Sequence, residues 1–177
     1  MNWLVDAIIA FAKRTPYFDL PGYMNRWWVV KPRRWLSFSI RVHQILRSDL
    51  DRHIHDHPWS YVTIILRGGY YEVTAISERE FWARAFVGGA SFEEGGSYYL
   101  RKWYGPGSIL FRRAQHAHKL IIPDGTTCWT LFMMGPYSQG WGFYTPEGKV
   151  PWREYLPDEA AAVDAAIGKH YTHKGVA

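Results

Sequence analysis

The sequence predicts an all-β protein with a short helix at each end. Three observations support this prediction. Short segments of alternating apolar and polar residues follow one another along the chain, turns rich in glycine and proline separate them, and aromatic residues make up 18% of the 177 residues. Roughly eight to ten short strands in this arrangement, with no helix between them, indicate a sandwich or a barrel.

The two ends of the chain differ from its middle. Apolar residues in segment 1–12 recur at helical spacing, which predicts an amphipathic helix that packs on the body of the protein. The stretch from there to residue 34 is aromatic and interrupted by prolines, so we expect it to wrap the body as an irregular segment. Residues 157–169 begin with an acidic turn and continue with alanines, which predicts a closing helix.

The strands are expected between these ends, where residues 35–153 would form the barrel core of a single domain that spans residues 1–177. Gly68-Gly69 predicts a hairpin, and the glycine-rich segment 88–96 predicts a loop. The expected strands are 35–47, 53–67, 70–77, 81–86, 97–104, 108–113, 116–122, 127–134 and 141–145.

Composition and charge argue against several classes of function. The net charge of +5 is scattered without a long basic run, which indicates a solvated basic surface rather than a nucleic-acid site. The apolar N-terminal segment is too short to span a membrane and has no basic residues before it, so we expect neither an anchor nor a signal peptide. The single cysteine, Cys128, excludes an intrachain disulfide and fits a reducing, cytoplasmic setting.

Five histidines form two clusters about sixty residues apart, and these are the most informative residues of the chain. The clusters are His53-x-His55-x-His57 and His116-x-His118. In a strand, residues two positions apart share a face, so each cluster can present a row of imidazoles. Neutral imidazole binds iron, zinc, copper and nickel, and two rows on neighbouring strands predict a metal site.

The spacing around the first cluster resembles the first motif of the cupin superfamily. His55 and His57 are followed by Tyr61 at the position where cupins usually have a glutamate, and then by Gly68 at the motif glycine. The upstream glycine of the motif would fall at Asp49, so the chain departs from the pattern at two positions.

The second cluster resembles the second cupin motif. Gly107 is followed by an apolar run and then by His118, which would be the third histidine of the set, while Arg113 stands where a proline is usual. The resemblance covers about residues 35–153 and extends to a group of small uncharacterised single-domain cupins. It implies a double-stranded β-helix, the jelly-roll barrel of the cupins, with a metal at its centre.

The resemblance implies that His55, His57 and His118 hold a divalent transition metal, most simply Fe(II), with Zn and Ni as alternatives. We expect no carboxylate among the ligands, because Asp56 points to the opposite face of its strand, and the set therefore resembles that of the three-histidine thiol dioxygenases. In the alternative interpretation the barrel has no metal, and the imidazoles hydrogen-bond to one another or to Tyr61.

Two residues are candidates for acid–base catalysis. Tyr61 falls on the inward face and could donate its hydroxyl to a ligand, although a core tyrosine is the alternative. His116 shares a face with His118, and like His53 it could be a further ligand, an acid–base group, a partner that orients a ligand, or a histidine at the barrel rim.

The substrate-binding candidates are arginines, whose planar guanidinium matches a carboxylate in a two-point contact. We expect at most one of them to clamp a small-molecule ligand; the candidates are Arg41, Arg67, Arg112 and Arg113. Arg41 shares a strand face with His43. Trp59 is a candidate to line the cavity, with core packing as the alternative.

These residues predict a metal-binding cupin, most simply an Fe(II)-dependent dioxygenase that acts on a small polar molecule. The first alternative is a non-catalytic cupin that binds a small ligand, or a metal-free sugar-type isomerase or epimerase in which a histidine and Tyr61 transfer protons. The second is an interaction or structural protein whose aromatic N-terminal wrap forms a homodimer surface.

Overall fold

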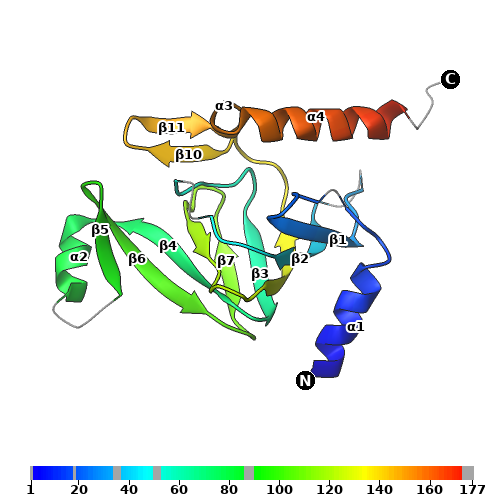
Figure 1. Ribbon diagram of the computed structural model, residues 1–177, viewed down its shortest axis with the longest axis horizontal. Helices are drawn as coiled ribbons and strands as arrows, with labels where there is room; N and C mark the ends of the chain where they lie inside the picture. The colour runs from blue at the N-terminus through cyan, green and yellow to red at the C-terminus, as the bar shows by residue number, and fades with distance from the viewer. Residues whose placement is uncertain (1, 18, 34–36, 50–52, 86–89, 173–177) are drawn as a thin grey trace.

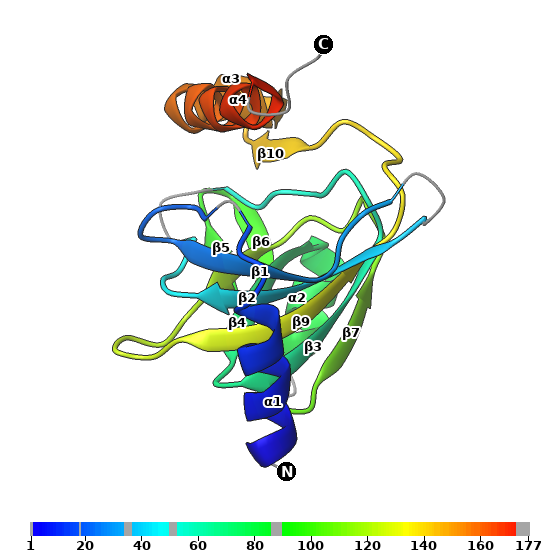
Figure 2. The same ribbon diagram turned by 90° about the vertical axis from the view of Figure 1, so that its right-hand side faces the viewer.

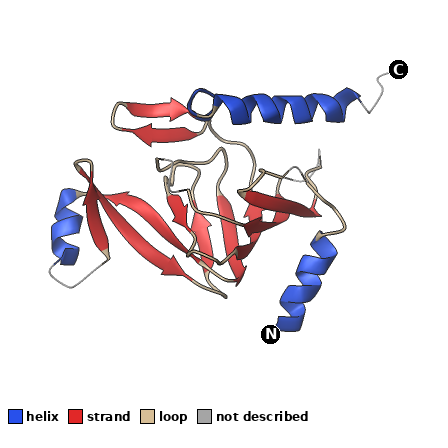
Figure 3. Cartoon of the chain, in the orientation of Figure 1, coloured by secondary structure: helices blue, strands red, loops and turns tan. Residues whose placement is uncertain are grey.

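Strands account for most of the regular structure in the computed structural model, which describes residues 2–17, 19–33, 37–49, 53–85 and 90–172. The strands are β1 (Met24–Val30), β2 (Ser39–Ile45), β3 (Tyr61–Arg67), β4 (Tyr70–Ile76), β5 (Ser91–Glu94), β6 (Ser97–Tyr104), β7 (Ile109–Arg112), β8 (Lys119–Ile121), β9 (Cys128–Met134), β10 (Gly142–Thr145) and β11 (Gly148–Pro151). The helices are α1 (Asn2–Ala12), α2 (Glu78–Ala85), α3 (Trp152–Tyr155) and α4 (Pro157–Thr172). The predicted all-β architecture with terminal helices is confirmed (Figure 3).

The strands form two antiparallel sheets and a separate hairpin (Figure 1). The five-stranded sheet has the order β1-β2-β9-β3-β7, the four-stranded sheet has the order β5-β6-β4-β8, and β10 pairs with β11. β9 lies between β2 and β3, so strands far apart in the sequence are neighbours in space. This crossing between two antiparallel sheets is the arrangement of a jelly roll.

Both sheets contribute to one hydrophobic cluster. Ile45, Ile65 and Cys128 come from the five-stranded sheet, and Tyr70 and Leu120 come from the four-stranded sheet. Because side chains alternate along a strand, the residues between these positions face away from the cluster. The interior of the protein therefore lies between the two sheets.

Helix α1 covers part of the outer face of the five-stranded sheet (Figure 2). Ile9 and Ala12 are buried against Val42 of β2 and Trp129 of β9. The predicted amphipathic helix and its packing on the body are thus confirmed. None of the helices in the described residues combines the length and hydropathy that a bilayer-spanning helix needs.

The predicted strand at residues 81–86 is wrong, because residues 78–85 form helix α2. The Ser77 hydroxyl accepts a hydrogen bond from the backbone N–H of Glu80, and Glu80 pairs with Arg84 one turn later. An N-terminal cap and an i,i+4 ion pair are local helix signals, and here they override the strand preference of the aromatic pair Phe81-Trp82. The expectation that no helix lies between the strands is wrong for the same reason.

Gly68-Gly69 does not close a hairpin, since β3 and β4 belong to different sheets. Gly68 has a φ of +73°, and a Cβ there would lie 2.1 Å from the carbonyl oxygen of Thr127. The two glycines let the chain turn from one sheet into the other against a neighbouring backbone. The hairpin glycines are instead Gly95 and Gly96, both with positive φ, between β5 and β6.

Two segments expected to be irregular contain strands. β1 lies within the predicted N-terminal wrap and pairs with β2, and β5 lies within the predicted glycine-rich loop 88–96. The prolines of the wrap precede or follow β1 and do not interrupt it. Conversely, part of a predicted strand is irregular. The segment from His53 to Ser60 is not part of β3, although His55 forms isolated bridges with His118 and Phe143.

The β10–β11 hairpin and helices α3 and α4 form a layer at one end of the two sheets (Figure 1, Figure 2). The layer is joined to the histidine segment by two backbone hydrogen bonds, from Asp56 N–H to Gly142 and from Tyr144 N–H to Ile54. Phe143 stacks on Tyr155, with ring centroids 4.0 Å apart. The first histidine cluster therefore lies at the junction between this layer and the sheets.

Candidate metal centre

The backbone pairs the two histidine clusters directly. The N–H of His55 donates to the carbonyl of His118 at 2.9 Å, and the N–H of His118 donates to the carbonyl of His55 at 3.0 Å. His57 continues the contact through its N–H, which donates to Ala114 at 3.0 Å. Segments sixty residues apart are thus held as neighbouring extended chains, and alternation brings their imidazoles to one side.

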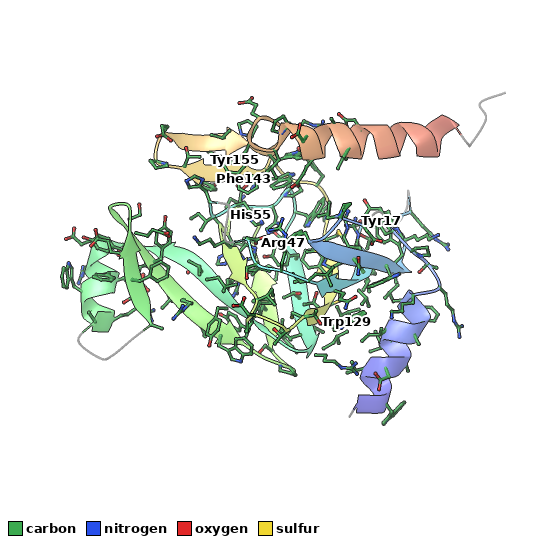
Figure 4. All side chains as sticks on the ribbon, viewed as in Figure 1. Tyr17, Arg47, His55, Trp129, Phe143 and Tyr155 are labelled. Atoms are coloured by element: carbon green, nitrogen blue, oxygen red, sulfur yellow. The ribbon has the colours of Figure 1, made fainter. Side chains whose placement is uncertain are left out.

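The structure brings the three predicted ligands together. The candidate ligand atoms of His55, His57 and His118 all lie within 4.8 Å of one another. Nε2 of His57 is 3.0 Å from Nε2 of His118, and the two ring centroids are 5.1 Å apart. In Figure 4, His55 lies next to Phe143 at the boundary between the hairpin and the sheets, and the two rings are 5.3 Å apart.

The imidazole of His57 is held in the form that can bind a metal. Burial, followed by the neighbouring His118, His55 and His116, lowers the pKa of His57 well below its ordinary value. His57 is therefore neutral at neutral pH and retains a lone pair on one ring nitrogen.

A buried carboxylate, which the sequence interpretation missed, completes the cluster. Glu72 of β4 is 3% exposed, and its Oε1 lies 2.7 Å from Nδ1 of His118 and 3.3 Å from Nε2 of His116. Glu72, His116 and His118 form a second set with ligand atoms within 4.8 Å of one another. We expected no carboxylate among the ligands; a carboxylate nevertheless contacts the histidines, and it comes from the facing sheet and not from the motif position.

Arg112 balances the charge of Glu72. Its guanidinium donates from Nε and Nη2 to the two carboxylate oxygens, and Nη2 also donates to the Tyr104 hydroxyl. Burial acts to raise the pKa of Glu72, but hydrogen bonds from His116, His118 and Arg112 hold that pKa well below its usual value. Glu72 is therefore ionised at neutral pH, and the guanidinium of Arg112 is directed at this carboxylate.

The Glu72 carboxylate determines which nitrogen of His118 is available. An ionised carboxylate only accepts hydrogen bonds, so Nδ1 of His118 carries the proton, and Nε2 keeps a lone pair that faces Nε2 of His57. Two imidazole nitrogens that each lie about 2.1 Å from one ion, at about a right angle, are about 3 Å apart. The observed 3.0 Å separation and the donor set fit a transition-metal ion.

Tyr61 lies beside the same nitrogen. Its hydroxyl is 3.4 Å from Nε2 of His118, and its ring is 4.8 Å from that of His57. Burial and the negative charge of Glu72 raise the pKa of Tyr61 well above its ordinary value, so the phenol keeps its proton at neutral pH. Tyr61 is thus a hydrogen-bond donor at the edge of the cluster, opposite Glu72.

The predicted substrate-binding arginines differ in their positions and contacts. Arg67 lies at the far end of β3 from Tyr61, is half exposed and pairs with Asp6 of α1, so the structure does not bring it to the histidines. Arg113 is exposed. Arg41 is 9% exposed on the inner face of β2, with its guanidinium carbon 4.3 Å from the centre of the Trp28 ring.

The remaining candidates lie around the cluster. Trp59 packs against the buried residues Trp28, Tyr61 and Met134. His53 is hydrogen-bonded to Tyr155, 2.8 Å away, outside the group of ligands. Asp56 points away from the imidazoles, as predicted, and accepts a hydrogen bond from the backbone of Gly142.

Glu72 carried one signal that the sequence could have given. In the strand predicted at residues 70–77, Tyr70 and Glu72 are separated by one residue and share a face. A carboxylate next to an inward aromatic residue must have a buried partner, and two histidine clusters were available for that role.

The fold resembles solved structures at low sequence identity. The DMSP lyase DddQ from Ruegeria pomeroyi DSS-3 aligns with a TM-score of 0.50 and 17% identity, over 81% of this chain and 68% of that chain. An RmlC-like cupin from Shewanella frigidimarina NCIMB 400 aligns with a TM-score of 0.46 and 14% identity, over 73% of this chain and 90% of that chain. A cupin-2 domain from Rhodospirillum rubrum aligns with a TM-score of 0.47 and 11% identity, over 75% of each chain.

These similarities concern the fold alone, and no protein-family model and no curated protein matches the chain. The two-sheet topology and the paired histidine clusters agree with the motifs in the sequence. The chain has a two-sheet jelly-roll fold, as its sequence predicted, and this fold resembles that of the DMSP lyase structure.

Proposed function

We propose that the chain is a metal-dependent enzyme of the cupin type that acts on a small polar molecule. His55, His57 and His118 would hold a divalent transition metal. The observation that carries this proposal is the meeting of three imidazoles from two distant segments, with two Nε2 atoms 3.0 Å apart. Three imidazole ligands leave positions on the metal for other ligands.

The reaction class that this donor set supports best is that of an Fe(II)-dependent dioxygenase. When bound, Fe(II) would supply Lewis acidity and redox chemistry toward dioxygen at its open positions. Glu72 orients His118 without entering the ligand set, since its charge is already shared with Arg112. Tyr61 would hold its proton toward a substrate atom next to His118.

Metal content tests the proposal first. The full chain, purified without a histidine tag and reconstituted with Fe(II) under anaerobic conditions, should hold about one iron per chain by mass spectrometry. His57→Ala and His118→Ala should lower the affinity for iron roughly tenfold or more. His53→Ala is the matched control, because His53 is hydrogen-bonded to Tyr155 outside the cluster, and it should keep the iron.

Oxygen uptake tests the reaction. The iron-loaded chain should consume dioxygen with at least one member of a panel of thiols, amino acids and phenols, and His118→Ala should not. Iron that stays well below one equivalent after reconstitution overturns the metal centre. Iron that binds without oxygen uptake on any panel member overturns the dioxygenase.

One contact favours a second candidate function, a metal-free isomerase. The Tyr61 hydroxyl and Nε2 of His118 lie 3.4 Å apart, so a proton donor and a proton acceptor share one site. Turnover of a sugar-type substrate that survives removal of metal by a chelator and is lost in Tyr61→Phe would support this function over the first.

A further inference from the structure

Three buried side-chain nitrogens near the candidate metal centre lack a hydrogen-bond partner within the described part of the chain. They are Nε of Arg41, Nε2 of His43 and Nε1 of Trp59. Buried donors in native proteins are almost always paired, and an exception needs a reason. Arg41 and His43 are more than nine-tenths buried, so neither side chain can turn to bulk water for that partner.

Of the three side chains, Arg41 has the largest free-energy cost of burial, because it is charged. Burial, the main effect, lowers the pKa of its guanidinium to about 10, which still leaves it charged at neutral pH. No carboxylate among the described residues forms an ion pair with it. Its guanidinium carbon lies 4.4 Å and 4.3 Å from the ring centres of Tyr17 and Trp28, which offsets part of the cost of burial.

The three donors belong to one wall. We call it the inner aromatic cluster, formed by Tyr17, Trp28, Trp59, Tyr61, Phe132 and Met134. Arg41 lies against Trp28, and the ring of His43 stacks on that of Phe132 at 4.8 Å. Trp59 packs within the cluster, and Tyr61 connects it to His118 of the metal centre.

Two arginines, Arg26 and Arg41, act on His43, and the carboxylate of Asp19 lies beside Arg26. Arg26 of β1 is directly opposite His43 of β2 in the strand register. Burial, Arg26 and Arg41 lower the pKa of His43 well below its ordinary value, so His43 is neutral and can donate from Nε2 in one tautomer. An anion could accept hydrogen bonds from the guanidinium of Arg41 and from the neutral donors of His43 and Trp59.

We propose that the inner aromatic cluster is the binding site of a small carboxylate with a flat apolar body. Nε of Arg41, with the adjacent Nη, matches the two oxygens of a carboxylate, and His43 and Trp59 supply further donors. The rings of the cluster pack against the body of the ligand. The proposal rests on the proposed function only in taking this ligand as the substrate; the binding itself needs no metal.

Binding to the metal-free chain tests this inference separately from the metal centre. The probes are benzoate and benzamide, which have the same shape and differ in charge. By isothermal titration calorimetry with the chelator-treated full chain, benzoate should bind with one site per chain, and benzamide should bind roughly tenfold more weakly or worse. Benzoate should also raise the melting temperature of the chain, since it binds only the folded state.

Two variants test whether benzoate binding depends on the planar guanidinium of Arg41. Arg41→Met, of similar length and without charge, should bind benzoate roughly tenfold more weakly or worse, and Arg41→Lys should fall between it and the unaltered chain. Arg67→Met is the matched control, because Arg67 pairs with Asp6 on the outer surface, and it should bind benzoate like the unaltered chain. Arg41→Lys keeps the charge, so it remains informative if Arg41→Met does not fold.

The outcomes separate the two proposals. Equal binding of benzoate and benzamide, no binding of benzoate, or unchanged benzoate affinity in both Arg41 variants overturns the carboxylate site. Loss of benzoate binding in Arg41→Met together with full iron content supports it. A chain that binds benzoate and takes up no iron keeps this site and overturns the metal centre alone.

Discussion

At the scale of single residues, the candidate metal centre depends on a line of hydrogen bonds from Arg112 through Glu72 to His118. Each member restricts the next: the guanidinium keeps the carboxylate ionised, and the carboxylate keeps the proton of His118 on Nδ1. The lone pair of Nε2 is then directed at His57 and Tyr61. Such outer partners orient metal ligands and raise their basicity.

Replacing Glu72 by glutamine tests this line. The amide can still accept from Nδ1 of His118, but it loses the charge that Arg112 and both histidines require. We expect metal affinity to fall about 10- to 100-fold. We also expect the free energy of unfolding to fall by about 3 kcal/mol, because a buried cation loses its partner. Metal titration and urea denaturation measure the two effects.

Glu80→Gln provides the matched control for that prediction. Glu80 pairs with Arg84 on the exposed surface of α2, so the same substitution should cost only about 0.5 kcal/mol and leave metal affinity unchanged. If Glu72→Gln loses stability but keeps its metal affinity, Glu72 stabilises the fold and does not orient His118.

Residues of the site differ in how far the sequence could predict them. The histidines were visible because spacing of two on extended chain places side chains on one face, whatever the rest of the fold does. For Glu72 the alternation indicated burial but not which histidine it meets, because that depends on the register of β4 against β8, where Glu72 is opposite Leu120. Such a register is a tertiary property that no local pattern of residues contains.

At the scale of elements, Asp56 holds the β10–β11 hairpin on the histidine segment. The carboxylate is fully buried and accepts hydrogen bonds from the Gly142 backbone, the Tyr144 hydroxyl and the Lys149 ammonium. All of its donors come from the segment that contains the hairpin. His55 and His57 flank Asp56 in sequence, so the hairpin and the metal centre use opposite faces of the same three residues.

Asp56→Ala should therefore disturb both the hairpin and the metal centre. We expect a loss of about 2–4 kcal/mol in the free energy of unfolding, somewhat reduced because Lys149 is partly exposed. Metal affinity should fall as well, since the spacing of His55 and His57 is no longer fixed. Asp164→Ala, which breaks an exposed pair with Arg153, should cost less than about 1 kcal/mol. Equal losses in the two variants would contradict a role for Asp56 in holding the hairpin.

Gly68→Ala tests the turn between the two sheets. The new Cβ would lie 2.1 Å from the Thr127 carbonyl oxygen on a backbone with positive φ, so the turn must shift. Gly96→Ala introduces the same backbone strain with nothing within 4 Å. We expect about 1 kcal/mol for Gly96→Ala and at least about 1–2 kcal/mol more for Gly68→Ala, measured by urea denaturation. Similar costs for both would mean that the close approach to Thr127 is easily relieved.

Strands and helices were predicted well where the hydrophobic alternation was long. They were predicted poorly where local hydrogen bonds determined the secondary structure. β6 is where the alternation placed it, at Ser97–Tyr104. α2 was mistaken for a strand because its aromatic residues favour strands, while its cap at Ser77 and its Glu80–Arg84 pair are brief local signals. β1 was missed because nearby prolines suggested irregular chain, whereas strands tolerate prolines just outside their ends.

At the scale of the whole molecule, the core between the two sheets should open in a single step. Cys128 reports on it, because it is fully buried in the cluster that both sheets share. Burial raises the pKa of its thiol to about 12, so only about 1 in 3,000 thiols is ionised at about pH 8.5.

Alkylation of this single cysteine should therefore follow global unfolding. We expect no reaction with iodoacetamide in the native chain, and labelling that rises with urea at the same midpoint as the loss of circular dichroism. Mass spectrometry of the labelled chain measures the extent. Labelling well below the unfolding midpoint would show that the sheets separate locally and that the core is not one cooperative unit.

The alternation at residues 55–57 has a consequence for engineering. The metal ligands occupy one side of this short segment, and the residue between them anchors a distant β-ribbon on the other side. A transplant of the three imidazoles into another scaffold would leave a buried acid without its donors unless residues 139–149 were moved with them. The smallest portable unit of this chain is therefore the motif together with that ribbon.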